Sequence, residues 1–247
     1  MDVNASERSA EVLRGGARAT LRYLATSHGW DRIALAEGEF HTGDDPIKAD
    51  REAQRVFEQF VYANRHLIDN SVYDIVGEES IRALPTEFEP GTRVIVVDPL
   101  DGSTQWAIFS HAFCVAAYCL VSGADRSLKL ESAVVATPQH TFTWRADAVG
   151  FEFRPLHPEN AAPIVTQSAV EETPYVTPSI AFTAFKPKDR KAAVQLMEAF
   201  SDWNVMPIGG NPVTPYVVTS GLTAALTLRP QAGWDAVGIL LASSASA

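Results

Sequence analysis

The sequence has few cysteines, no long apolar run and no pattern of a secretory signal, and each absence excludes a class of protein. Its 247 residues include only two cysteines, Cys114 and Cys119. Their offset of five residues on a strand places them on opposite faces, so we expect two small buried thiols and neither a disulfide nor a metal pair. No apolar run reaches the roughly 18 to 20 residues that cross a bilayer. We therefore expect a cytoplasmic protein that does not bind membranes.

Clusters of basic residues are also lacking, which argues against a nucleic-acid partner. The formal net charge at pH 7 is −10. Proteins that bind DNA or RNA gain much of their affinity from Lys and Arg contacts to phosphates, and we expect no such partner here. An acidic protein can still bind a small phosphate when divalent cations lie between the two. The sequence also has no HExxH zinc motif and no GxSxG serine-hydrolase motif.

The order of apolar patterns predicts helices, then an antiparallel sheet, then alternating strands and helices. Helical spacing predicts helices over about 6–27 and 47–65. Strands follow in "VYDIVGEES", "RVIVVD", "FCVAAYCLV", "KLESAVVAT" and "HTFTWRA". A proline-rich connection at about 155–178 leads to strands in "SIAFTAF", "NVMPIG" and "TAALTL", with helices at 188–200, 213–221 and 234–244. This alternation indicates a second α/β layer.

Four carboxylates follow two of the predicted strands within 24 residues, namely Glu78, Glu79, Asp98 and Asp101. If the two strands are neighbours, the four side chains lie at one edge of a sheet. Carboxylates so close repel one another unless protons or cations neutralise them, and hard oxygen ligands select Mg²⁺, Mn²⁺ or Ca²⁺. The sequence therefore predicts a metal site at this edge.

The segment "VVDPLDGST" carries two of these acids on a turn. Pro99 stiffens the exit from the strand and Gly102 permits a tight turn, so both acids and the Leu100 carbonyl can point into one pocket. Ser103 and Thr104 stand where a helix can begin, and free N–H groups at a helix start favour phosphate. Asp-Gly is also a common turn signal, so a simple strand exit is the alternative for this motif alone.

The sequence contains three separated motifs, "VGEES" at 76–80, "VVDPLDGST" at 96–104 and "WDAVG" at 234–238. Together they resemble the Mg²⁺-dependent, lithium-sensitive inositol monophosphatase superfamily, which also includes fructose-1,6-bisphosphatases and 3'-phosphoadenosine 5'-phosphate phosphatases. The segment "DPIKADREAQ" at 45–54 is similar to the acidic stretch before the family's second helix. The resemblance implies an α/β (α+β layered) fold of alternating α-β-α-β-α layers. We expect an N-terminal part over 1–150 and a C-terminal part over 151–247, with the active site at their junction.

The resemblance also implies a role for each matching residue. Glu78, Asp98 and the Leu100 carbonyl would hold the first metal ion, which activates water. The second ion, which stabilises the leaving oxygen, would be held by Asp98, Asp101 and Asp235. Two or three Mg²⁺ ions are implied, and Mn²⁺ can replace them. Asp50 and the Ser103 hydroxyl would orient the attacking water. The backbone of Gly102 and Ser103 would bind the phosphate.

Two of these residues also have purely structural interpretations. A carboxylate near a helix start is favoured by the helix dipole, which accounts for Asp50 without catalysis. Asp235 can cap the last helix, and a capping position still allows it to face the metal ions.

Some positions depart from the family pattern. The family usually has Thr where this chain has Ser103, which retains the hydroxyl. Inositol-specific members carry a glutamate near the position of Leu228 and Arg229, so inositol is a weaker candidate substrate. The stretch "GGNPVTPYVV" at 209–218 replaces a small-residue segment. The chain ends 12 residues after Asp235, so it resembles either a shortened member or one whose end is missing.

We therefore expect a Mg²⁺-dependent phosphomonoesterase that hydrolyses a small phosphorylated polyol, sugar or nucleotide, with a homodimer implied by the resemblance. A phosphatase with an aspartyl nucleophile would need an Asp-x-Asp pair, whereas Asp98 and Asp101 are three positions apart. The other alternative is a catalytically weak relative that acts as a binding or regulatory protein.

Overall fold

The computed structural model describes residues 5–27, 48–78, 87–107, 112–148, 150–156, 164–166, 178–182, 190–206 and 224–226, together with Gly233 and Val237. The predicted helix at 213–221 lies outside these residues. Of the predicted helix at 234–244, only Val237 is described, and it is helical and buried. None of the described helices is long and apolar enough to cross a membrane.

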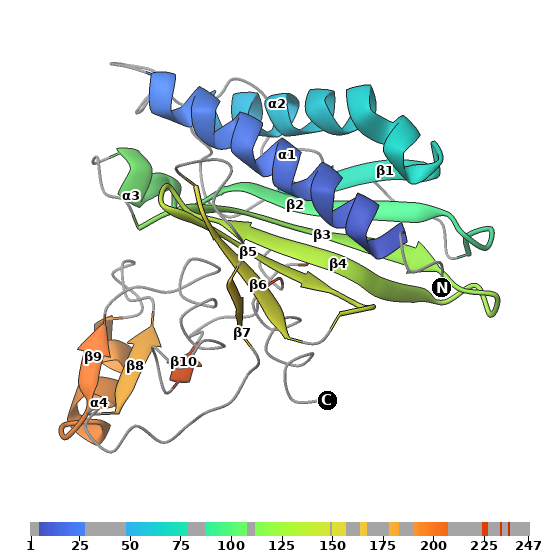
Figure 1. Ribbon diagram of the computed structural model, residues 1–247. Helices are drawn as coiled ribbons and strands as arrows, with labels where there is room; N and C mark the ends of the chain where they lie inside the picture. The colour runs from blue at the N-terminus through green and yellow to red at the C-terminus, as the bar shows by residue number, and fades with distance from the viewer. Residues whose placement is uncertain are drawn as a thin grey trace.

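A seven-stranded mixed sheet forms the centre of the described structure (Figure 1). Its strands lie in sequence order, and β1 and β2 are parallel while all later neighbours are antiparallel. The strands are β1 (Val72–Gly77), β2 (Arg93–Asp101), β3 (Cys114–Ser122), β4 (Leu128–Ala136), β5 (His140–Arg145), β6 (Phe151–Pro155) and β7 (Ile164–Thr166). The first five confirm the predicted strands. In this order β1 is an edge strand, and among the described strands it is hydrogen-bonded to β2 alone.

Two helices cover one face of this sheet (Figure 1). They are α1 (Ala5–Thr26) and α2 (Lys48–Asn64), and α2 continues into the 3₁₀ turn η2 (Arg65–Ile68). Both helices are amphipathic, which is why each buries one stripe and leaves a polar face in water. Their bounds confirm the two predicted N-terminal helices.

Alternation along the strands divides the core into two layers. On β2, Ile95 and Val97 pack under the helices, whereas Val94 and Val96 belong to a second cluster on the opposite face. The cysteines follow the same rule, since Cys119 lies on the helix side and Cys114 on the other. Both are buried free thiols, as predicted.

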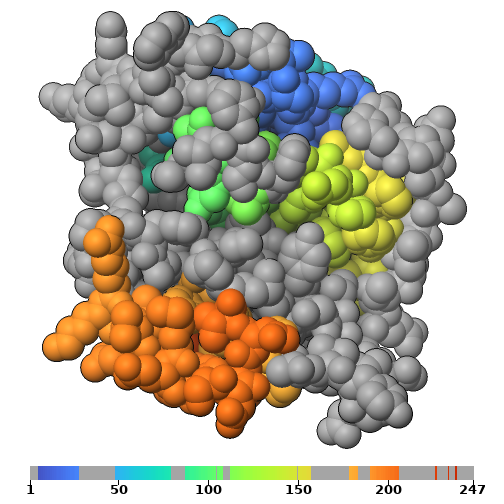
Figure 2. Space-filling model, turned by 90° about the vertical axis from the view of Figure 1, so that its left-hand side faces the viewer, coloured from blue at the N-terminus to red at the C-terminus, as the bar shows by residue number. Residues whose placement is uncertain are grey.

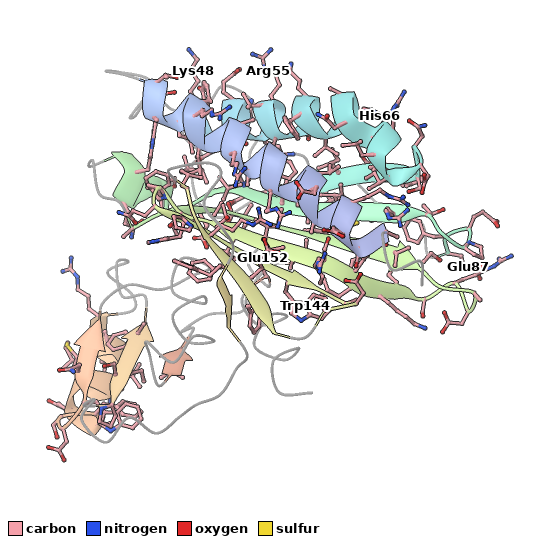
Figure 3. The ribbon with its side chains drawn as sticks, viewed as in Figure 1. Lys48, Arg55, His66, Glu87, Trp144 and Glu152 are labelled. Carbon is pink, nitrogen blue, oxygen red and sulfur yellow. The ribbon has the colours of Figure 1, made fainter. Side chains whose placement is uncertain are left out.

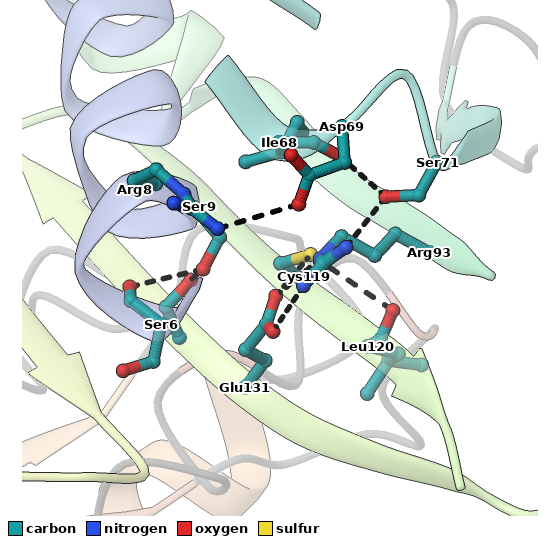
Figure 4. A network of polar contacts seen from close by, with 11 residues as sticks. Ser6, Arg8, Ser9, Ile68, Asp69, Ser71, Arg93, Cys119, Leu120 and Glu131 are labelled. Atoms are coloured by element: carbon teal, nitrogen blue, oxygen red, sulfur yellow. Dashed lines mark hydrogen bonds and ion pairs between the residues drawn. The ribbon is translucent and has the colours of Figure 1, made fainter. Parts of the chain in front are cut away.

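A buried ion pair lies between α1 and the sheet (Figure 4). Arg93 of β2 donates two hydrogen bonds of 2.7 Å to the Glu131 carboxylate of β4, which is only 1% exposed. These hydrogen bonds raise the pKa of Arg93 above its usual value. Ser9 of α1 and Ser132 of β4 share a further hydrogen bond of 2.8 Å. Because burying an unpaired charge is costly, Arg93 and Glu131 stabilise the fold only as a pair, and the serine pair links α1 to β4.

A second, three-stranded parallel sheet has the order β10-β8-β9. Its elements are β8 (Ser179–Phe182), α4 (Arg190–Ala199), β9 (Asn204–Met206) and β10 (Ala224–Leu226), which confirms the predicted strand–helix–strand alternation. In Figure 1 this sheet and α4 lie on the side of the large sheet opposite α1 and α2.

The large sheet continues past the predicted boundary at residue 150. Strands β6 and β7 extend it as far as Thr166, inside the region expected to be a proline-rich connection from about 155. The change from one sheet to the other therefore falls between Thr166 and Ser179. The reason is that β6 pairs along β5, so the two strands form a hairpin that belongs to the first sheet.

Candidate active site

The parallel pairing of β1 and β2 brings the chain positions before two of the predicted acids together. Gly77 at the end of β1 is the register partner of Val97 on β2. Glu78 directly follows β1, and Asp98 is the next residue of β2. The sequence prediction that these two strands are neighbours is confirmed. Glu79 lies outside the described residues.

Strand β2 does not end at Asp98 but continues to Asp101. Its pairing with β3 runs through Asp98 opposite Ala116, shifts register, and resumes with Asp101 opposite Cys114. The Leu100 N–H donates to Oδ1 of Asp98 at 3.1 Å within this irregular stretch. Pro99 cannot donate a ladder hydrogen bond, which accounts for the irregularity at this point. The result is a local bulge that separates the two aspartates without ending the strand.

Burial distinguishes the acids of this edge. Asp98 is only 4% exposed, whereas Glu78 and Asp101 are half-buried. Cys114, the register partner of Asp101 on β3, carries a fully buried thiol. Burial raises the pKa of this thiol well above its usual value, and the negative charges of Asp101 and Asp98 raise it further.

The turn after β2 leads directly into a short helix. Gly102 has a φ of +94°, a conformation that favours glycine, and a Cβ there would lie 2.9 Å from the Ala112 carbonyl oxygen. Ser103 begins α3 (Ser103–Ala107), and Trp106 N–H closes the first turn onto the Gly102 carbonyl at 2.9 Å. Buried Trp106 anchors this helix in the core. The tight turn at Gly102 and a helix start at Ser103 are both as predicted.

Helix α2 places Asp50 in its first turn, where it is buried. One turn later, Gln54 reaches the end of β1: a Cβ on Gly77 would lie 2.6 Å from both the Gln54 Oε1 and the Val97 carbonyl oxygen. Gly77 therefore permits the start of α2 to approach the strand that leads to Glu78. Gln54 is not among the residues predicted from the sequence, although it lies one helical turn after Asp50.

The start of α2 and the end of β2 lie at the same end of the sheet. In Figure 3 the label of Lys48, the first residue of α2, stands above the end of the large sheet at which α3 lies. Figure 2, which faces this end, shows green atoms of the region near residue 100 at the surface between the blue helix and the orange second sheet with α4.

Asp235, the predicted ligand from the C-terminal part, lies outside the described residues. Gly233 and Val237, two residues before and after it, are described. The Gly233 carbonyl accepts a hydrogen bond of 3.0 Å from Tyr118, and Val237 is buried in the cluster on the sheet face opposite the helices. Among the residues that the structure describes, no group of three or more His, Cys, Asp or Glu side chains could hold a metal ion. Glu78, Asp98 and Asp101 are described, so these three alone do not form such a group. The complete ligand set, which includes Asp235, stays a prediction.

Comparisons with known proteins show the fold. No protein-family model matches the sequence, and no curated protein matches it. The solved structure of the extragenic suppressor protein SuhB from Bartonella henselae matches with a TM-score of 0.68 and 18% identity, over 95% of this chain and 84% of that chain. An inositol monophosphatase from Anabaena (Nostoc) gives a TM-score of 0.66 and 18% identity, over 97% and 82%.

A third structure is that of CysQ from Bacteroides thetaiotaomicron, described as a bacterial member of the inositol monophosphatase family. It gives a TM-score of 0.64 and 15% identity, over 96% of this chain and 86% of that chain. Three proteins of this kind, matched along nearly the whole chain, share one architecture with it. The predicted α+β layered fold is confirmed, and the chain has the fold found in inositol monophosphatases.

Proposed function

We propose that this protein is a Mg²⁺-dependent phosphomonoesterase of the inositol monophosphatase superfamily that acts on a small phosphorylated polyol, sugar or nucleotide. One observation carries the proposal: the register of two parallel strands, in which Gly77 of β1 and Val97 of β2, the residues directly before Glu78 and Asp98, are partners. The shared fold supports it, because the three motifs that resemble the superfamily lie on a chain with that superfamily's architecture.

The chemistry of the proposed donors suits a hard divalent cation. Glu78, Asp98, Asp101 and Asp235 would supply carboxylate oxygens, the ligands that Mg²⁺ prefers in proteins. The described residues alone form no group of three that could hold an ion, so the proposal requires Asp235. Cys114, the register partner of Asp101, is fully buried, and burial raises the pKa of its thiol well above its usual value. When bound, two such cations would lower the pKa of water and neutralise charge on the phosphate.

The remaining roles belong to the chain itself. In this proposal Glu78, Asp98, Asp101, the Leu100 carbonyl and Asp235 hold the ions. Asp50, in the first turn of α2, orients the attacking water together with the Ser103 hydroxyl. The N–H groups of Gly102 and Ser103, at the turn into α3, bind phosphate oxygens.

Phosphate release from a panel of substrates tests the proposal. The panel contains inositol phosphates, fructose bisphosphate, phosphoadenosine phosphate and histidinol phosphate, each assayed with Mg²⁺, with Mn²⁺ and with excess chelator. We expect release with at least one substrate that requires the metal and is inhibited by lithium. Activity that persists in excess chelator would contradict the mechanism.

Asp98→Asn is the decisive variant. Loss of a residue that merely supports a metal ligand typically costs about 10- to 100-fold, so loss of a shared ligand should lower kcat/KM by at least about 100-fold. Asp125→Asn is the matched control, because Asp125 is an exposed carboxylate on the β3–β4 turn, at the other end of the sheet. It should retain wild-type activity.

A binding or regulatory protein is the competing outcome. Calorimetric titration with Mg²⁺ separates the two functions when it accompanies the substrate panel. Metal binding that Asp98→Asn removes, without turnover of any substrate, would favour the regulatory function.

A further inference from the structure

Helix α4 exposes two large apolar side chains beside each other. Val194 is 48% exposed and Met197 is 46% exposed. They lie three positions apart, so they are neighbours on one side of the helix. A different side packs inward, where Ala193 is buried and Leu196 is half-buried. The helix therefore keeps an apolar side at the surface of the folded chain, and Figure 2 shows orange atoms of this region there.

Charged side chains flank this apolar pair at both ends. Arg190 and Lys191 stand one turn before Val194, and both are exposed. Glu198, also exposed, stands one turn after Val194. Spacings of three and four positions put these charges on the same side of the helix as the apolar pair. We call the five residues Arg190, Lys191, Val194, Met197 and Glu198 the α4 stripe. None of its three charged members forms an ion pair with another residue that the structure describes.

The signs of these charges are opposite to those that the helix itself favours. The start of a helix carries a partial positive charge and its end a partial negative charge. The first turn of α4 holds Arg190 and Lys191 and no acid, and its last turn holds Glu198 and no basic residue. A neighbouring helix that runs in the opposite direction reverses this disadvantage, because its negative end lies beside the two cations and its positive end beside Glu198.

We propose that the α4 stripe is a self-association surface, on which two copies of this chain pair their α4 helices antiparallel about a two-fold axis. An axis through the centre of the stripe sets Arg190 and Lys191 of each copy against Glu198 of the other. The two apolar side chains of each copy then meet at the centre. Such a contact uses the same residues on both copies, as a two-fold interface requires. The proposal does not rest on the proposed function, because the stripe contains no residue of the candidate active site.

The size of the stripe sets the strength of the association. A helix of 10 residues is about 15 Å long, so the contact buries less than the roughly 1,200 Å² of a stable interface. We therefore expect a reversible dimer that forms at high protein concentration and weakens as salt screens the charge pairs. Sedimentation equilibrium of the full chain, from micromolar to near-millimolar concentrations, measures the Kd of this dimer at low and at high salt.

Reversing the charges at either end of the stripe tests the antiparallel pairing. The double variant Arg190→Glu, Lys191→Glu and the single variant Glu198→Lys should each raise the Kd at least about tenfold, because like charges then face one another. An equimolar mixture of the two variants should associate again with about the wild-type affinity, because opposite charges meet at both ends of the mixed pair. A variant that had lost its fold could not give this restoration.

Net charge is controlled in two ways. Glu198→Lys moves the net charge of −10 toward zero, which alone favours association, so a higher Kd in this variant comes from the local contact. The double variant Arg55→Glu, Arg65→Glu changes the net charge as much as the double variant of α4 does, on exposed residues of α2 and η2. It should raise the Kd by less than about threefold, since exposed charges far from the contact are screened.

The apolar centre has its own matched pair of variants. Met197→Ser should raise the Kd at least about fivefold, because the substitution acts on both copies of a two-fold contact. Leu67→Ser, at a side chain of η2 that is 41% exposed, should leave the Kd unchanged.

The outcomes decide the proposal directly. Self-association of the wild type, its loss in each α4 variant and its return in the mixture would support it. A wild type that stays monomeric over the whole concentration range would overturn it. A dimer whose Kd the α4 variants leave unchanged would overturn it as well, because the contact would then lie elsewhere, and so would a mixture of the charge-reversed variants that fails to associate.

Discussion

Gly16 of α1 packs directly against the buried ring of Phe57 of α2. A Cβ at Gly16 would lie 2.8 Å from Phe57 Cε2, closer than a real methyl group can approach. Phe57 is fully buried, so its ring has no free space into which to move. A glycine that weakens an isolated helix is therefore what allows the two helices to pack.

Gly16→Ala should destabilise the protein despite its higher helix propensity. Overpacking a core costs about 1–3 kcal/mol, whereas Gly→Ala in a helix gains about 1 kcal/mol. We expect the free energy of unfolding, measured in urea, to fall by up to about 2 kcal/mol. Gly15→Ala is the comparison: its methyl would overlap the ring of Phe60, but that ring is half-buried and can turn outward. A larger loss in Gly15→Ala than in Gly16→Ala would contradict this explanation.

Glu131→Ala should be much more damaging, because it leaves Arg93 charged and buried without its carboxylate. Breaking a buried ion pair by removing one partner costs about 3–5 kcal/mol. The exposed pair Arg126–Glu87 is the control, and Glu87→Ala should change the free energy of unfolding by no more than about 0.5 kcal/mol.

The double variant Arg93→Met, Glu131→Met tests the cause of that loss. If the loss comes from an unpaired charge, two apolar side chains of similar size should recover most of the stability. A double variant as unstable as Glu131→Ala would show instead that the hydrogen-bond network itself is required.

Strong periodicity predicted most elements around the site. The helices α1 and α2 and the strands from β1 to β5 follow local patterns of apolar residues, which is why their bounds agree within a few residues. The positions of Glu78 directly after β1 and of Asp98 near the end of β2 could be expected because both acids follow short apolar runs. The packing role of Gly16 could not be predicted, since it depends on the ring of a residue in another helix.

The missed features depend on distant partners. Strand β6 (Phe151–Pro155) has only five residues and ends in proline, so its assignment depends on β5 beside it. In the sequence Tyr118 is one of several apolar residues of a strand. Its hydrogen bond could not be predicted because the partner, Gly233, is 115 positions away. Such pairs become visible only when the chain is folded.

Binding of Mg²⁺ should raise the thermal stability of the protein. A ligand that binds the folded state alone stabilises it by about 2.7 kcal/mol when its concentration is 100 times Kd. We therefore expect the Tm to rise with Mg²⁺ and to return to its metal-free value in excess chelator. Asp98→Asn should lose this dependence, whereas Asp125→Asn should keep it. An equal rise with Mg²⁺ in Asp98→Asn would place the ion elsewhere.

Both thiols should be unreactive in the folded protein at mildly alkaline pH. Burial raises the pKa of Cys119 well above its usual value, and the charge of Glu131 adds to the effect. Burial likewise dominates at Cys114. Since the thiolate is the reactive form, alkylation by iodoacetamide at about pH 8.5 should be negligible without denaturant and complete in urea.

The same raised pKa values give a sign for the pH dependence of stability. A thiol whose pKa is higher in the folded state than in the unfolded chain makes its full contribution to stability below the unfolded pKa, which is about 8.5. This contribution is lost as the pH rises from the unfolded pKa toward the folded pKa. The free energy of unfolding should therefore decline above about pH 8.5, and the decline should be shallower in Cys114→Ala, Cys119→Ala than in the wild type. An identical decline in the two proteins, or rapid alkylation of either cysteine in the folded state, would mean that these thiols ionise in the fold as freely as in the unfolded chain.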